Sequence, residues 1–378
     1  MTTPRAALIE AAERWGTPLY VTDLDLAAAN AQAWRQALPG ALVAYAVKAN
    51  PDPALLHRLA ADGIGFEVVG PIELALALRA GCPPERIVVN GVAQTDVDLA
   101  DALATGALVN AESLGALDAL LRSGGGRIGL RINPALDART HPHLATGAAD
   151  SKFGIGLDEV PEALARMQAA KVPVASIGAH IGSGIADLEP FARLAELLAR
   201  LADDAGAARI DLGGGFAGSA EAYAGAIGPH LPDTARLIAE PGRSIVADAG
   251  WLLTRVVRVQ ARGHLVVDAG MTELIRPMLY GARHPVTLLA AGEPTADRAW
   301  TVSGPICEAG DVLAHGIELG PEAGEGALLA IGEAGAYGLA MAMNYNGRLR
   351  PAQVVIEGGT LRLSRRRETL EDLVARDV

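Results

Sequence analysis

The sequence contains little cysteine and little lysine, and acidic residues outnumber basic ones. Cys82 and Cys307 are its two cysteines among 378 residues, and they lie far apart and outside any CxxC pattern. We therefore expect neither a disulfide framework nor a structural zinc site, which fits a reducing cytoplasm. The formal net charge of -12 also argues against a nucleic-acid partner, because phosphate backbones bind clusters of lysine and arginine.

Long uninterrupted apolar runs are missing as well. The N-terminal segment has neither a basic start before an apolar core nor a small-residue cleavage site. Charged residues or glycines interrupt the longest apolar stretches before they reach the length of a membrane span. We expect a cytoplasmic protein that acts on a small molecule, without a membrane partner or a bound metal.

Short β-rich runs alternate with Ala- and Leu-rich segments of helical periodicity from about residue 42 to residue 245. Eight such runs occur, at residues 42–49, 63–69, 86–91, 107–113, 127–134, 176–182, 209–215 and 237–245. Each is nearly continuously apolar, as strands of a parallel sheet covered on both faces are. The pattern predicts a closed (β/α)8 barrel of the TIM type over residues 27–250. An open doubly wound sheet is the alternative.

After residue 250 the pattern changes to strand-like pieces without intervening helices, at 251–260, 263–270, 284–290, 326–337 and 352–364. This predicts a second, antiparallel β domain that resembles a barrel. The strand-like segment TPLYVTDL near the N-terminus can pair with it. We therefore expect a β domain made of residues 1–26 together with 251–378.

Lys48 is one of three lysines and follows the apolar run VAYAV at the end of the first barrel strand. Burial disfavours the charged amine and lowers its pKa, which allows a lysine to form a Schiff base with an aldehyde. A lysine whose amine reaches solvent from the strand end is the alternative.

Other strand ends supply further polar and glycine-rich segments. HIGSG contains His180, Gly182 and Ser183, DLGGGF contains Gly213–Gly215, and EPGR contains Glu240, Gly242 and Arg243. In a TIM barrel the carboxyl ends of the strands face one mouth, and the last two loops commonly bind phosphate. A glycine turn exposes backbone N–H groups to such an anion, although alone it is more often a tight turn.

Together these segments resemble the fold-type III decarboxylases that use pyridoxal 5'-phosphate (PLP), most closely the diaminopimelate decarboxylase family. The resemblance spans nearly the full length. Its motifs are YAVKAN, LRINPALDARTHPHLATG with SKFGIG, HIGSG, DLGGGF, EPGRSIVADAG, DAGMTELIRPMLYGARH, SGPICEAGD and GAYGLAMAMNYNGR.

The resemblance implies roles for individual residues. Lys48 would form the Schiff base with PLP, His180 would stack on its ring, and Glu240 would keep the ring nitrogen protonated as an electron sink. Cys307 would protonate the intermediate that remains after CO2 leaves, and would come from the neighbouring subunit of a homodimer with shared active sites. The phosphate would be held by Ser183, Gly214, Gly215, Gly242, Arg243 and Tyr337.

The resemblance also implies the substrate. Arg243, Arg276 and Tyr280 would bind its distal carboxylate, and Glu308 would bind its distal amino group. Tyr337 would also belong to the substrate-binding residues. The expected reaction is decarboxylation of meso-2,6-diaminopimelate to L-lysine and CO2, the last step of lysine biosynthesis. A guanidinium fork suits a carboxylate and finds nothing to bind in ornithine, so Arg276 is the most discriminating of these residues.

The sequence departs from the family pattern at Glu67, Gly70, Gln94 and Gly184, which bear on substrate identity. One alternative is a decarboxylase of ornithine, lysine, arginine, carboxynorspermidine or a carrier-linked amino acid. A second is an alanine racemase, against which Glu240 argues because that enzyme places an arginine at the ring nitrogen. A third is a PLP-binding protein without catalysis.

Overall fold

The computed structural model describes residues 5–137, 146–148 and 150–378. It divides into two compact units. The first, which we call the barrel unit, comprises Ala28–Ile245. The second, the β unit, comprises Met1–Ala27 and Val246–Val378.

The barrel unit contains eight parallel strands that form a closed ring. They are β2 (Leu42–Ala46), β3 (Gly65–Val68), β4 (Ile87–Val89), β5 (Leu108–Ala111), β6 (Arg127–Asn133), β8 (Ser176–Gly178), β9 (Ile210–Asp211) and β10 (Leu237–Ala239). The ring closes because β10 pairs with β2 and β5 pairs with β6. The short β7 (Ile155–Gly156) pairs with β6 outside the ring. The predicted (β/α)8 barrel is confirmed, and the open doubly wound sheet is wrong.

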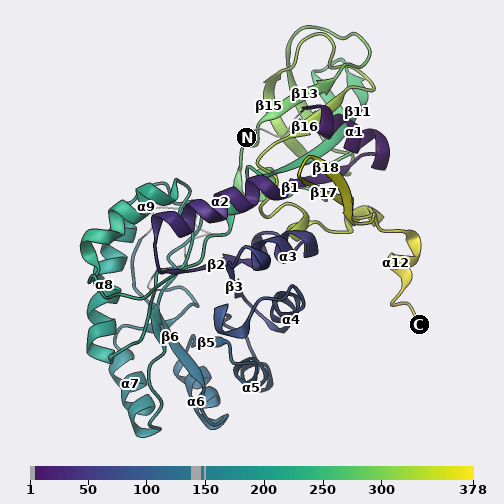
Figure 1. The fold of residues 1–378 in the computed structure, drawn as a ribbon. Coiled ribbons are helices and arrows are strands. Elements are labelled where there is room, and N and C mark those ends of the chain that lie inside the picture. The colour runs from purple at the N-terminus through teal and green to yellow at the C-terminus, as the bar shows by residue number, and fades with distance from the viewer. Residues whose placement is uncertain (1–4, 138–145, 149) are drawn as a thin grey trace. The chain divides into compact units, whose positions relative to one another are not determined.

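Helices follow the strands and lie on their outer side (Figure 1). They are α2 (Leu24–Ala37), α3 (Pro53–Ala61), α4 (Pro71–Arg79), α5 (Asp96–Ala104), α6 (Leu114–Arg122), α7 (Val160–Ala169), α8 (Glu189–Ala205) and α9 (Ala220–Ile227), with short 3-10 turns η1 (Val47–Ala49), η2 (Pro84–Arg86) and η4 (Gly228–His230). Local sequence sets their ends: the Asp52 carboxylate caps α3, and α8 stops at Gly206, which adopts a left-handed conformation.

Most barrel strands are shorter than the apolar runs that predicted them. The first strand ends at Ala46, so Lys48 lies in η1. The last ends at Ala239, and Arg243 begins the short helix α10 (Arg243–Val246). In the last run the chain turns at Pro241, which lacks the N–H that would continue the ladder. These turns place the polar residues at the mouth rather than inside the sheet.

The β unit is built on a nine-stranded sheet. It contains β1 (Leu19–Asp23), β11 (Gly250–Gln260), β12 (His264–Val267), β13 (Val286–Ala290), β14 (Ala299–Ser303), β15 (Val312–Glu318), β16 (Leu328–Ile331), β17 (Ala352–Glu357) and β18 (Thr360–Arg365). The other elements of the unit are α1 (Arg5–Trp15), α11 (Arg276–Tyr280), α12 (Leu370–Val374), η5 (Leu339–Met341) and η6 (Tyr345–Gly347).

As expected, the N-terminal strand β1 joins this sheet, where it pairs with β11 and β17. The sheet is mixed, however, so the prediction of a purely antiparallel domain was wrong. The pairs β1–β17 and β12–β14 are parallel. Long connections join the partners in both pairs, so no hairpin forces them to run in opposite directions. Helix α1 and strands β14 and β15 were not among the predicted pieces.

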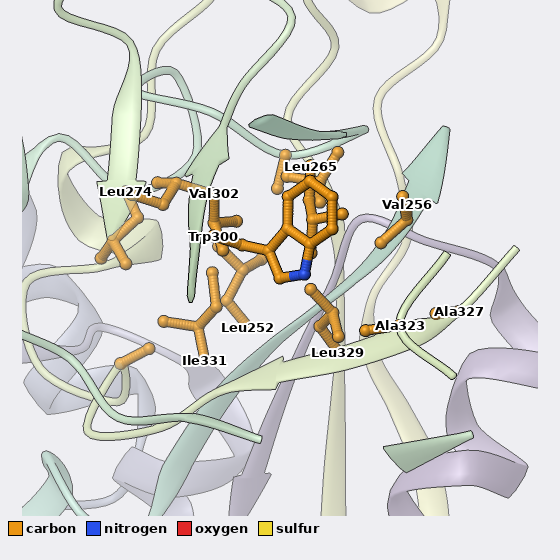
Figure 2. Close-up of a cluster of buried hydrophobic side chains, with 14 of the residues drawn as sticks. Leu252, Val256, Leu265, Leu274, Trp300, Val302, Ala323, Ala327, Leu329 and Ile331 are labelled. Atoms are coloured by element: carbon orange, nitrogen blue, oxygen red, sulfur yellow. The ribbon is translucent and has the colours of Figure 1, made fainter. Parts of the chain in front are cut away.

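The core of the β unit packs around Trp300. Figure 2 shows its ring among Leu252, Leu265, Val302 and Leu329, all of them buried. Full burial of a valine or leucine side chain typically stabilises a fold by about 1.5–3 kcal/mol. Among the described residues, none of the helices combines the length and the apolar character that a membrane crossing requires.

Candidate active site

Polar side chains gather at the carboxyl ends of the barrel strands, which are otherwise apolar. Several of them line a small cavity of about 10 Å3 at this end of the barrel. Its lining consists of Asn90, Asn110, Arg131, Gly178, Ala179, His180, Asp211 and Glu240. Catalytic residues of TIM barrels lie at this end of the strands, so this mouth is the candidate active site.

Lys48 forms an ion pair with Glu67, between Nζ and Oε2. The Glu67 side chain is 2% exposed and the Lys48 side chain 34% exposed. The surroundings therefore differ from the dry apolar setting expected for this amine. A buried carboxylate needs a cation beside it, and Lys48 supplies it. Glu67, one of the positions that depart from the family pattern, thus brings its carboxylate into direct contact with the Lys48 amine.

Two further acids lie at the same end of the barrel as Lys48. Glu240 follows β10, Asp211 ends β9, and their carboxyl groups are hydrogen bonded to each other. Burial raises the pKa of Glu240 well above its usual range, and the nearby Asp211 carboxyl raises it further. Burial likewise raises the pKa of Asp211, while the hydrogen bond from Gly213 N–H lowers it. The pair therefore retains a proton that an exposed pair would release.

His180 follows β8 and faces the same mouth. Burial lowers the pKa of its imidazole well below the usual range, and the positive charges of Arg131 and Lys48 lower it further. Gly214 N–H donates a 3.0 Å hydrogen bond to its Nδ1, so the proton of the neutral ring is on Nε2. The imidazole ring of His180 is thus neutral, and its orientation is fixed.

The glycine turn after β9 requires glycine for steric reasons. A Cβ at Gly214 would lie 2.1 Å from the carbonyl oxygen of Glu240, and one at Gly215 would lie 1.8 Å from that of Gly182. Gly215 also has a left-handed φ of 101°. Nearby, Arg243 Nη2 donates a 3.1 Å hydrogen bond to Ser183 Oγ, which brings the ends of β8 and β10 together.

These groups suit PLP by their chemistry. An aldehyde requires an amine, and Lys48 provides it. A phosphate dianion requires cationic and hydroxyl donors beside a backbone without side chains, as Arg243, Ser183 and the glycine turn provide. A pyridine nitrogen requires an acid that can share a proton, and Glu240 is such an acid. The residues of the barrel unit therefore fit the cofactor.

The remaining predicted site residues lie in the β unit. Arg276 is buried, 7% exposed, and its guanidinium lies 5.5 Å from the ring centre of Tyr280 and 5.8 Å from that of Tyr337. Tyr337 has a left-handed φ of 57°, a conformation that costs a non-glycine residue about 1 kcal/mol or more. The structure thus brings these three residues together.

Cys307 and Glu308 lie on the exposed turn between β14 and β15. The buried Asp311 carboxylate anchors this turn, because it accepts 2.7 Å and 2.6 Å hydrogen bonds from the N–H groups of Ile306 and Met271. Glu308 is hydrogen bonded to the phenol of Tyr345, which raises the pKa of that phenol.

Several residues of the mouth were missed from the sequence. Asn90, Arg131, Asp211 and Glu112 are all buried, and Glu112 accepts a 2.9 Å hydrogen bond from Arg131. A usable signal existed, since each is a polar residue within or directly after an apolar strand run. The motif at 130–147 extends over residues 138–145, which lie outside the described residues.

Similarity to known proteins agrees with this geometry. The family described as pyridoxal-dependent decarboxylase, pyridoxal binding domain, matches residues 24–247. The diaminopimelate decarboxylase of Deinococcus radiodurans is 44% identical, with all of both chains covered. That of Aquifex aeolicus is 38% identical over 97% of this chain and 93% of the relative.

Solved structures extend the similarity to three dimensions. Diaminopimelate decarboxylase from Helicobacter pylori, complexed with L-lysine, has a TM-score of 0.93 and 33% identity over 97% of this chain and 98% of that chain. Lysine/ornithine decarboxylase from Vibrio vulnificus, at 23% identity and a TM-score of 0.81, shares the fold. The chain therefore belongs to the PLP-dependent decarboxylases, and within them to the diaminopimelate decarboxylase family.

Proposed function

We propose that this chain catalyses the PLP-dependent decarboxylation of meso-2,6-diaminopimelate to L-lysine and CO2. The observation that carries the proposal is the meeting of Lys48, His180, Glu240 and Arg243 at one end of the barrel, where they follow three different strands, β2, β8 and β10. Full-length similarity to diaminopimelate decarboxylases supports the substrate.

When bound, PLP supplies an electron sink for the electron pair that is released as CO2 leaves the substrate. Lys48 would hold the aldehyde carbon of the cofactor, and Glu67 would keep the amine in place. The neutral His180 would pack on the ring without adding charge, and Glu240 would keep a proton at the ring nitrogen. The residues that would bind the phosphate are Ser183, Gly214, Gly215, Gly242, Arg243 and Tyr337.

Substrate recognition depends on Arg276, Tyr280, Tyr337 and Arg243, with Glu308 as the partner of the distal amino group. The planar guanidinium of Arg276 can donate two parallel hydrogen bonds to the distal carboxylate. Its two flanking aromatic rings restrict how the guanidinium turns. A substrate without that carboxylate could not accept these two hydrogen bonds, which disfavours ornithine and lysine.

Cys307 returns a proton to the substrate carbon, and it does so in the active site of a second copy of the chain. Its exposed position is suited to delivery of a proton to a group outside its own turn. The residues beside it, Ala309 and Gly310, line a pocket of about 950 Å3 together with Met278, whose side chain is exposed. An open hollow beside the turn that carries this thiol favours a homodimer with shared active sites.

The two parts of the chain divide this work. Residues 27–250 form the PLP-binding domain, and residues 1–26 with 251–378 form the β domain that supplies Cys307, Glu308, Arg276, Tyr280 and Tyr337. The low cysteine content favours a reducing compartment, the cytoplasm, as its location.

An assay of product formation tests the function. Purified protein with PLP is given meso-diaminopimelate, and CO2 and L-lysine are measured beside a panel of ornithine, lysine, arginine and carboxynorspermidine. L-Alanine is tested separately for racemisation. We expect CO2 and L-lysine from diaminopimelate in equal amounts. Preferred release of CO2 from another panel member would indicate a decarboxylase of a different substrate. Conversion of L-alanine to D-alanine would indicate a racemase, and bound PLP without any turnover would indicate a cofactor-binding protein without catalysis.

A further inference from the structure

Asn90 connects two acids of the barrel unit through one amide group. Its Nδ2 donates a 2.8 Å hydrogen bond to Oε1 of Glu240 and a 3.2 Å hydrogen bond to Oε1 of Glu67. All three residues are buried, and Glu67 is also the ion-pair partner of Lys48. The acid beside the Schiff-base amine and the acid at the end of β10 therefore share a single donor.

The orientation of this amide is fixed from its other side. Oδ1 of Asn90 accepts a 2.9 Å hydrogen bond from Nδ2 of Asn110, and Oδ1 of Asn110 accepts one of 3.0 Å from Oγ of Ser176. Because Oδ1 of Asn90 is the acceptor for the Asn110 amide, the NH2 group of Asn90 faces the two acids. The chain of donors thus runs in one direction, from Ser176 to Glu67 and Glu240.

A neutral donor suits this position because the surrounding charges are already crowded. The charged and titratable groups that face Glu240 and Asp211 are Glu67, Lys48, Arg131, His180 and Tyr223. An aspartate in place of Asn90 would add a fourth carboxyl and no donor. An alanine would leave two buried acceptors without this hydrogen bond, which is costly where water is excluded.

We propose that Asn90 is a positioning residue that holds Glu67 against the Lys48 amine and Glu240 toward the cofactor ring nitrogen, and so couples the two acids during cofactor binding. This inference rests on the proposed function, because it assigns both acids to the PLP site.

Loss of the Asn90 amide should shift the pKa of the buried acids in one direction, which can be measured. The hydrogen bond from Asn90 stabilises the charged form of Glu240 and lowers its pKa, against the larger raising effects of burial and of Asp211 and Glu67. Without the amide, the buried acid pair would keep its proton up to a higher pH. A hydrogen bond to a charged group corresponds to about one to two pH units of such a shift.

The experiment compares wild type with Asn90→Ala, which removes the donor, and with Asn90→Ser, which keeps one hydroxyl donor. Gln94→Ala is the matched control, because the Gln94 amide donates to the Asn90 backbone oxygen but not to the acids. Two quantities are measured on the full chain: the PLP dissociation constant, and the pH midpoint of the protonated-carboxyl infrared band above pH 6. Ordinary carboxyls are ionised in that range, so the part of the band that differs between wild type and Asn90→Ala reports the buried pair.

For Asn90→Ala we expect PLP binding weakened about 10- to 100-fold and the infrared midpoint raised by about one pH unit or more. Asn90→Ser should lie between, and Gln94→Ala should match wild type. Weaker binding with an unmoved midpoint would mean that Asn90 only supports packing, and would overturn the inference, as would an unchanged dissociation constant. If wild type bound no PLP, the proposed function would fail, while the midpoint would still decide whether Asn90 acts on the acids.

Discussion

The backbone N–H of Gly214 donates a hydrogen bond to Nδ1 of His180, which fixes the tautomer of a buried imidazole. The glycine turn and the ring that would cover the cofactor are therefore one structural unit. A substitution in the glycine turn should therefore alter the position of the His180 ring, and a substitution of His180 should alter the turn.

The first prediction concerns the pH dependence of stability. The pKa of His180 is lowered in the folded state. Below about pH 6.5, His180 therefore binds a proton in the unfolded chain but stays neutral in the folded chain. This contribution lowers the free energy of unfolding by up to about 1.4 kcal/mol per pH unit as the pH falls below that value. His180→Gln should remove it.

The raised pKa values of Asp211 and Glu240 act in the opposite direction, because the folded state then holds protons that the unfolded state releases. The informative quantity is therefore the difference between wild type and His180→Gln in urea unfolding from pH 7.5 to 5.5. A difference that does not change with pH would contradict the neutral, buried histidine.

Gly214→Ala should weaken both folding and PLP binding, since the new Cβ would lie 2.1 Å from the Glu240 carbonyl oxygen. Overpacking of this kind typically costs about 1–3 kcal/mol. Gly225→Ala, within α9 and with open space around its Cβ, is the matched control. It should be neutral or stabilising by up to about 1 kcal/mol, because alanine favours helix. Equal effects of the two changes in thermal unfolding would refute the steric argument.

Arg276→Lys keeps the positive charge and removes the planar fork. We expect kcat/KM for diaminopimelate to fall about 10- to 100-fold with unchanged PLP binding, because lysine cannot donate two parallel hydrogen bonds to a carboxylate. Arg298→Lys is a fitting control: this guanidinium also lies over an aromatic ring, 5.4 Å from the centre of Trp300, but belongs to no predicted site. A similar loss in both variants would remove the specific role of Arg276.

Cys307→Ala should leave the PLP absorption band intact and reduce kcat by about 10²- to 10⁴-fold, the usual contribution of a positioned acid. Cys82→Ala serves as its control, because Cys82 is buried and burial raises the pKa of its thiol to about 11. Steady-state and single-turnover rates together separate proton delivery from CO2 release. Unaltered turnover of Cys307→Ala would exclude this thiol as the acid.

Local pattern predicted the barrel because every strand run was apolar and each was followed by a helical segment. It also predicted that Lys48, His180 and Glu240 meet, since parallel strands in a barrel share one mouth. It did not predict that Asn90 joins Glu67 to Glu240, because this contact depends on closure of the ring and on strand register. The parallel pairing of β1 with β17 was missed for a similar reason: no local turn fixes the direction of a strand that comes from the other end of the chain.

The most direct test of the account is to identify the lysine that binds PLP. The protein is incubated with PLP, reduced with borohydride to make the linkage permanent, digested, and analysed by mass spectrometry. With three lysines in the chain, the result is unambiguous: we predict the pyridoxyl adduct on Lys48. An adduct on Lys152 or Lys171 in its place, or none on any lysine, would contradict the assignment on which the proposed chemistry depends.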